Sequence, residues 1–271
     1  MSALSSSLSE ILIKNHNQQP IQKSWLNKVP HITLAFWVIK IMSTTVGETV
    51  ADFLAVDAGL GQTITSTMMG VGLSIALFIQ LKTRGYTPWI YWLTVVLVSI
   101  VGTQITDLLT DKLHVSLYVS TSIFTVALIA IFSIWYAVEK SLSIHYIVTK
   151  RRELFYWATI LCTFALGTAA GDLATEALGL GFTWGVAIFG LMITACYGAY
   201  KWGANAVITF WAAYILTRPF GAAFGDLLTQ SQTYGGLGLG AKWTSIIFLT
   251  IIVILVAIAQ AKQCNNANLQ P

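Results

Sequence analysis

Charged residues are scarce in this sequence. Only 10% of its 271 residues are Asp, Glu, Lys or Arg, and 56% are hydrophobic, whereas soluble domains carry about 25% charged residues. So few charges cannot cover the surface of a water-soluble domain of this length. The apolar residues also occur in runs of about 20, the length that crosses a bilayer as an α-helix. The composition therefore predicts an integral membrane protein whose first partner is the lipid bilayer.

Cysteine and histidine are few and scattered. The three cysteines, Cys162, Cys196 and Cys264, form no spaced cluster, and neither do the four histidines. We therefore expect neither a zinc site nor a disulfide framework. No His-Glu-x-x-His motif, serine–base pair or nucleotide-binding loop stands out, so the sequence predicts neither an enzyme nor a covalently bound cofactor.

Eight apolar runs follow a polar beginning. Residues 1–30 lack the apolar core and cleavage site of a signal peptide, and we expect them to form a tail or an interfacial stretch. Gly, Pro and charged residues separate the runs. They predict an all-α fold with transmembrane helices at residues 31–54, 61–81, 88–110, 115–138, 154–176, 181–200, 205–228 and 243–261. Residues 262–271 would form a C-terminal tail.

Positive charges are unequally distributed between the two sides of this topology. An even number of helices puts both termini on one side, which also holds the loops with Lys82, Arg84, Lys140, Lys150, Arg151, Arg152 and Lys201. The opposite loops carry only Lys112 and Lys242. Positive-inside bias predicts cytoplasmic termini, in the cell (inner) membrane. Because topology explains these basic residues, we expect no nucleic-acid partner.

A fourfold internal repeat organises the chain. When Trp37, Trp92, Trp157 and Trp211 are aligned, a glycine follows ten residues later and an aspartate five residues after that. The glycines are Gly47, Gly102, Gly167 and Gly221, and the aspartates are Asp52, Asp107, Asp172 and Asp226. Each copy is one helical hairpin, over residues 31–81, 88–138, 154–200 and 205–261. The copies are parallel, so their pseudo-symmetry axis should follow the membrane normal, and two halves of two hairpins are the simplest arrangement.

This Gly-x-x-x-x-Asp pattern resembles a family of bacterial membrane proteins built from tandem copies of a "repeat of unknown function". The resemblance covers nearly the whole chain after the N-terminal tail and is carried by the four Gly and Asp pairs. It implies paired membrane helices. It implies no activity, so the function has to be inferred from the residues.

The aspartates top polar stripes on the odd-numbered helices, because residues four apart share a helix face. The stripes are Thr44, Glu48 and Asp52; Ser99, Thr103, Asp107 and Asp111; Thr168, Asp172 and Glu176; and Arg218, Ala222, Asp226 and Gln230. Polar groups are costly in lipid, so the four stripes should face the bundle interior and converge. A small residue four positions after each glycine would let the helices approach closely.

The depth of the aspartates leaves an alternative open. Each lies roughly 32 Å along its helix, at 1.5 Å per residue, where it could cap a helix in solvated headgroups. Repetition at one register, with Glu48 a turn deeper, favours a shared acidic site. The tryptophans lie about 22 Å from the aspartates, which argues against a common aromatic cage. They are predicted to form a cytoplasmic aromatic belt or to pack between helices.

Two basic residues fall inside predicted helices. Arg218 lies two turns below Asp226 and is predicted to pair with acids of neighbouring copies, as a structural or gating ion pair. Pro219 beside it could kink or break the helix. Lys40 is predicted either to snorkel towards the cytoplasmic interface or to share the ion-pair or gating role.

The acidic stripes favour transport of a small cation. Carboxylates with Thr hydroxyls are hard oxygen ligands that suit Mn²⁺, Mg²⁺ or Ca²⁺. The predicted metal ligands are Glu48, Asp52, Asp107, Asp172 and Asp226. Crowded carboxylates share protons because like charges disfavour full ionisation, so proton coupling is chemically available. A passive cation channel and a membrane scaffold without transport remain alternatives.

Overall fold

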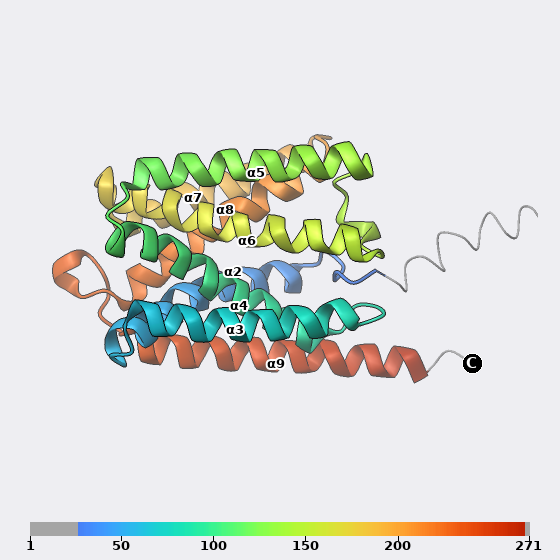
Figure 1. The fold of residues 1–271 in the computed structure, drawn as a ribbon, viewed down its shortest axis with the longest axis horizontal. Coiled ribbons are helices and arrows are strands. Elements are labelled where there is room, and N and C mark those ends of the chain that lie inside the picture. The colour runs from blue at the N-terminus through green and yellow to red at the C-terminus, as the bar shows by residue number, and fades with distance from the viewer. Residues whose placement is uncertain (1–26, 269–271) are drawn as a thin grey trace, which may run out of the picture.

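The structure is a computed structural model that describes residues 27–268, and over this range it contains helices and no strand (Figure 1). Eight helices are long and apolar enough to cross a membrane, which confirms the predicted all-α, eight-helix fold. They are α2 (Leu34–Asp52), α3 (Gly61–Lys82), α4 (Pro88–Asp107), α5 (Leu117–Glu139), α6 (Lys150–Asp172), α7 (Gly181–Lys201), α8 (Ala206–Thr229) and α9 (Ala241–Asn268). Predicted tail residues 1–26 and 269–271 lie outside the described range.

The two ends of the bundle differ in their connections. The first described residues and the end of α9 lie at the same end, on the right in Figure 1, together with the loops 83–87, 140–149 and 202–205. We call this the termini end. The other end, here called the far end, carries the turns 58–60, 113–116 and 178–180 and the longer connection 230–240.

Helix α6 begins earlier than the sequence predicted. Its first residue is Lys150 rather than residue 154. The Thr149 hydroxyl accepts a hydrogen bond from the backbone N–H of Arg152 at 3.3 Å, so this threonine is an N-cap that satisfies one free donor of the first turn. The charged residues 150–153 form that first turn, where apolarity gives no signal of a helix.

The first helix of each copy belongs to an inner ring. Helix α2 packs against α4 and α8, and α6 packs against α4 and α8, so the four helices close on themselves. The second helix of each copy packs mainly on the first helix of the next copy: α3 on α4, α5 on α6, α7 on α8, and α9 on α2. The predicted division into two halves is therefore wrong. The second helix of each copy covers the first helix of the next copy. All four copies are therefore joined in the same way.

The repeated glycines close the ring. A side chain at Gly47, Gly102, Gly167 or Gly221 would collide with the residue three positions before the glycine of the following copy: Ser99, Phe164, Arg218 and Thr44. A Cβ at Gly102, for example, would lie 2.6 Å from the Phe164 Cβ. Without a side chain at these positions, neighbouring backbones approach closely, as small residues allow in membranes.

Aromatic residues fill the ring near the termini end. Phe36, Tyr91, Tyr156 and Phe210 occupy the same position in each copy and are all buried. The hydroxyls of Tyr91 and Tyr156 lie 2.6 Å apart. The repeated tryptophans also pack between helices, since Trp92, Trp157 and Trp211 are at most 4% exposed. The packing interpretation is therefore right for these three tryptophans, whereas Trp37 is half-buried.

The predicted N-terminal tail extends too far into the chain. Lys28, Val29 and Pro30 were expected in it, yet all three are buried. Val29 belongs to the main hydrophobic core. The apolar Val29-Pro30 pair is too short to register as a hydrophobic run, and the contacts of Lys28 are long-range.

We predict that Gly102→Ala destabilises the protein. The added methyl group would lie 2.6 Å from the Phe164 Cβ and 3.2 Å from the Ala165 backbone N, so the α4–α6 contact must open, at a cost of about 1–3 kcal/mol for overpacking. Thermal unfolding in detergent measures the change. Gly198→Ala in α7 is the control, because its methyl group meets nothing within 4 Å. Equal stability of the two variants would contradict the tight ring.

Candidate cation-binding site

Arg218 occupies the centre of the inner ring. Its side chain is 1% exposed and reaches from α8 to the other three inner helices. Nη1 donates to the Thr44 carbonyl at 3.2 Å, and Nη2 donates to Glu48 Oε2 and Thr168 Oγ1, both at 2.7 Å. Nη2 also contacts the Thr103 hydroxyl. One guanidinium therefore links all four copies, and its buried charge is compensated by Glu48.

Helix α8 is continuous through Pro219, so the prediction of a break there is wrong. The proline instead faces the two small residues of α6. A Cβ at Gly167 would lie 3.0 Å from Pro219 Cδ, and one at Gly171 would lie 3.4 Å from Pro219 Cα. This close approach places the neighbouring Arg218 against Gly167, where the guanidinium can cross the ring.

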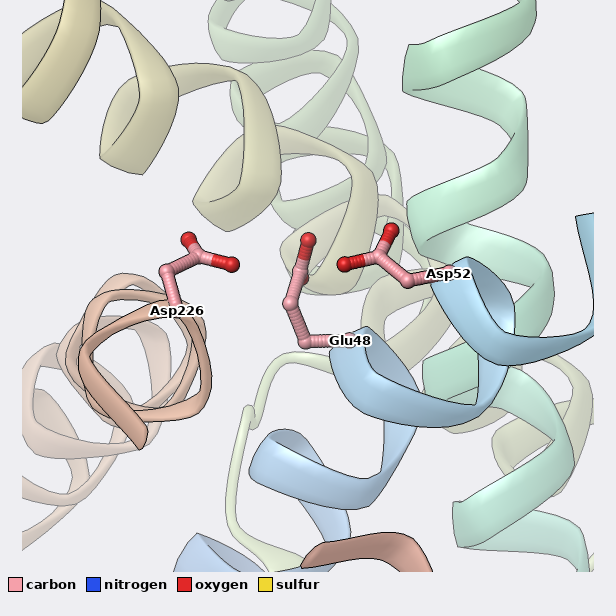
Figure 2. A group of neighbouring side chains, drawn as sticks. All are labelled: Glu48, Asp52 and Asp226. Carbon is pink, nitrogen blue, oxygen red and sulfur yellow. The ribbon is translucent and has the colours of Figure 1, made fainter. Parts of the chain in front are cut away.

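A cluster of carboxylates lies one layer towards the far end. Glu48, Asp52 and Asp226 each offer an oxygen, and these three atoms lie within 4.8 Å of one another. Figure 2 shows the Glu48 carboxylate between those of Asp52, from the same helix, and Asp226, from α8. Glu48 and Asp226 are 7% and 6% exposed, and Asp52 is half-buried. Three acids from two copies thus share one region.

The other two predicted metal ligands lie outside this three-residue group. Asp107 and Asp172 are half-buried at the same register of α4 and α6. Asp107 Oδ2 accepts a hydrogen bond from Gln62 Nε2 of α3 at 3.3 Å. The far mouth of the ring is therefore acidic on all four helices, with its tightest group on α2 and α8.

Asp111 and Glu176 lie beyond the α-helical part of the predicted stripes. Both are exposed. Each lies in a π-helical segment, Leu108–Lys112 or Leu173–Ala177, that directly continues α4 or α6. A π-helix closes hydrogen bonds from i to i+5 rather than i+4, so the four-residue spacing that put these acids on the inner face ends at Asp107 and Asp172.

The π-helical segments recur after the aspartate. Phe53–Asp57 follows Asp52 as Leu108–Lys112 follows Asp107 and Leu173–Ala177 follows Asp172. In the fourth copy α8 continues as an α-helix beyond Asp226 to Thr229. π-Helical segments are rare in proteins, and those that occur are often found at functional sites. The aspartates of the first three copies therefore mark the last α-helical position before the helix widens.

The predicted polar lining is entirely buried. Thr44, Ser99, Thr103 and Thr168 are all 0% exposed. The hydroxyls of Thr103 and Thr168 contact Arg218 and also donate to carbonyls one turn back in their own helices. Thr44 contributes its carbonyl instead, and Ser99 Oγ has no hydrogen-bond partner in the described part of the chain. Three of the four lining residues therefore contact the arginine, and Ser99 does not.

Lys40 lies inside the ring, one layer nearer the termini end than Arg218. It is 1% exposed, which makes the snorkelling interpretation wrong. Its Nζ lies 4.0 Å from the centre of the Phe164 ring and 4.3 Å from that of Tyr214. Within residues 27–268 it has no ion pair or hydrogen bond. Its gating role stays a prediction.

Phe164 and Gln62 are site residues that the sequence analysis did not select. Phe164 holds the position in its copy that Arg218 holds in the last one, so the repeat alignment contains the signal. Its ring lies beside both Lys40 and Arg218. Gln62 is on α3, the second helix of its copy. It lies outside the aligned motif, and nothing in the sequence marks it.

These features define a class: a multi-pass helical membrane protein with a closed fourfold ring, an arginine at its centre and carboxylates at one mouth. The family described as Repeat of Unknown Function (DUF347) matches the chain four times in tandem, at residues 35–86, 90–141, 155–203 and 209–263. The chain belongs to this family. No curated protein and no solved structure is significantly similar to it.

We predict that Arg218→Met strongly destabilises the protein, by about 3–5 kcal/mol, because it leaves Glu48 buried without its partner. The double variant Arg218→Met/Glu48→Gln removes the orphaned charge as well and should recover part of the loss. Arg218→Lys should not substitute, since an ammonium lacks the planar fork that reaches several acceptors. Unfolding of the unmodified protein, Arg218→Met, Glu48→Gln and the double variant forms a double-mutant cycle, and additive effects would show that the pair is not coupled.

Proposed function

We propose that this protein is a membrane carrier for a hard divalent cation of the Mn²⁺, Mg²⁺ or Ca²⁺ class. The observation that carries the proposal is the position of Glu48. Its carboxylate lies beside those of Asp52 and Asp226 and at the same time pairs with Arg218 at 2.7 Å. Glu48 can therefore serve a cation in the cluster or the arginine below it.

The ligand chemistry fits this class of cation. Three carboxylates supply hard oxygen ligands, which Mg²⁺, Mn²⁺ and Ca²⁺ prefer to nitrogen or sulfur. Two of the three acids are nearly buried, so a bound ion would replace water on one side with fixed protein oxygens. A dication would also relieve the repulsion among neighbouring carboxylates.

In this proposal Arg218 competes with the cation for the Glu48 carboxylate. While the cluster holds no ion, the guanidinium neutralises Glu48 and ties the four inner helices together through Thr44, Thr103 and Thr168. A cation that takes Glu48 as a ligand removes that neutralising bond and loosens the centre of the ring. Ion binding is thus linked to the contact that holds the helices closed, which a carrier requires.

The filled centre of the ring favours a carrier over an open channel. Below the acids, Arg218, Phe164 and Lys40 occupy successive positions, and the four aromatic residues Phe36, Tyr91, Tyr156 and Phe210 follow towards the termini end. A uniform pore needs a continuous lining, whereas these layers differ in charge and size from copy to copy.

Orientation and coupling complete the proposal. The basic loops gather at the termini end, which we assign to the cytoplasm of the cell (inner) membrane by the positive-inside rule. The acidic mouth then faces outward. Protons compete with metal for carboxylates, so exchange of a cation against protons is the coupling that this site would support.

The test is Mn²⁺ binding by the purified protein and Mn²⁺ uptake into vesicles that contain it. Asp52→Asn/Asp226→Asn should lower affinity at least about tenfold, because loss of even outer-shell partners costs about 10–100-fold in metal affinity. Lower pH should also reduce bound Mn²⁺, since the ligands must be ionised.

The matched control is Asp111→Asn/Glu176→Gln, which removes the same charge from exposed positions at the same end. Because neither carboxylate belongs to the three-residue group, the control should lower the affinity for Mn²⁺ clearly less than Asp52→Asn/Asp226→Asn does. Equal losses in both double variants would indicate a diffuse surface effect and overturn the site. Binding without uptake in sound vesicles would favour a scaffold that holds a cation.

A further inference from the structure

The segment before α2, residues 27–33, is fastened to the termini end at several points. The Tyr86 N–H donates to the Asn27 carbonyl at 2.9 Å, and the Ile147 N–H donates to Asn27 Oδ1 at 3.0 Å. The Lys28 N–H returns a bond to the Ile147 carbonyl at 3.1 Å. The segment thereby joins the loop after α3 to the loop before α6, and in Figure 1 it lies between the ends of these helices.

The Lys28 ammonium contacts two oxygen atoms. Its Nζ lies 2.5 Å from Glu153 Oε2 and 3.1 Å from the Leu81 carbonyl. Lys28 is 5% exposed and Glu153 is 1% exposed, so water has little access to the pair. Leu81 lies in the last turn of α3, where carbonyls lack helical partners and the helix dipole favours a cation.

Gln80 also contacts Glu153, and its own amide oxygen has no hydrogen-bond partner in the described chain. Its Nε2 donates to Glu153 Oε1 at 3.3 Å, and the side chain is 0% exposed. Around the ammonium, the Glu153 carboxylate and the Leu81 carbonyl are hard oxygen ligands, and Gln80 holds the second oxygen of that carboxylate. The single negative charge of this set matches one positive charge.

We propose that Glu153 and the Leu81 carbonyl, with Gln80 positioning the carboxylate, form a second cation site, specific for a monovalent alkali cation such as Na⁺, and that residues 27–33 are its lid. In the closed state the Lys28 ammonium occupies the site. An alkali cation that enters displaces this ammonium and frees the segment. The site lies at the opposite end of the bundle from the Glu48 cluster. In both places a basic side chain of the protein neutralises a buried acid, and this parallel with Arg218 rests on the proposed function.

The first experiment measures alkali-cation binding in the background Asp52→Asn/Asp226→Asn, which disables the Glu48 cluster and keeps the Arg218–Glu48 ion pair. Adding Lys28→Gln leaves Glu153 buried without a cation, so Na⁺ should raise the unfolding temperature saturably relative to choline at equal ionic strength. Adding Glu153→Gln as well should abolish the Na⁺ effect. The same response with and without Glu153 would overturn the site, and no response at all would also overturn it.

The second experiment follows the lid in the otherwise unmodified protein by hydrogen exchange. The Tyr86 and Ile147 amides both bond to Asn27 and report directly on docking. Lys28→Gln should accelerate exchange at both. Lys201→Gln is the matched control, because Lys201 is exposed at the same end and its Nζ lies over the Tyr197 ring, away from both reporter amides. Na⁺ should also accelerate these amides in the unmodified protein, and protection that is unaffected by both changes would overturn the lid.

Neither readout uses Mn²⁺ or transport. A protein that fails to bind Mn²⁺ but shows these Na⁺ effects would contradict the proposed carrier function and leave the second site standing. The reverse outcome would remove the second site alone.

Discussion

The buried guanidinium of Arg218 is the interaction on which the rest of the structure depends. A cation in the middle of a membrane bundle is costly unless its donors and charge are satisfied. Here the acceptors come from all three other copies: Thr44 and Glu48 from α2, Thr103 from α4 and Thr168 from α6. No single hairpin, and no pair of hairpins, can supply this set. The arginine therefore requires the complete ring, and the glycines that let the inner helices touch are what bring those acceptors within reach.

The fourfold repeat forms the ring of inner helices, and the positions at which the copies differ form the candidate site. The Trp, Gly and Asp positions are alike in every copy, whereas the residue three positions before the glycine is Thr44, Ser99, Phe164 or Arg218. One copy thus supplies the cation, another an aromatic ring, and the first copy supplies Glu48, which both the arginine and the neighbouring aspartates can use. A fully symmetric ring would place four like acids around the axis without a preferred binding position. The unequal copies instead gather Glu48, Asp52 and Asp226 on one side.

Much of this arrangement could be predicted from the sequence because it follows from local periodicity. The apolar runs predict the eight helices, and the shared register of glycine and aspartate predicts that the polar stripes converge. Other features depend on packing between distant segments. The π-helical segments that carry Asp111 and Glu176 begin where the α-helical period ends, and four-residue spacing in the sequence cannot show this. The burial of Lys40 depends on the Phe164 and Tyr214 rings of two other helices. Likewise, the sequence predicts that Lys28 belongs to a polar tail, because its partner Glu153 lies far along the chain.

The central claim is that Glu48 is shared between a tethered arginine and a bound cation. Anomalous diffraction from crystals of the protein grown with Mn²⁺ tests it most directly, because it locates the metal and the arginine in one experiment. We predict a single Mn²⁺ peak within coordinating distance of the Glu48, Asp52 and Asp226 carboxylates, with the Arg218 guanidinium withdrawn from Glu48. A peak elsewhere, or Mn²⁺ at the cluster with the Arg218–Glu48 ion pair intact, would contradict the account.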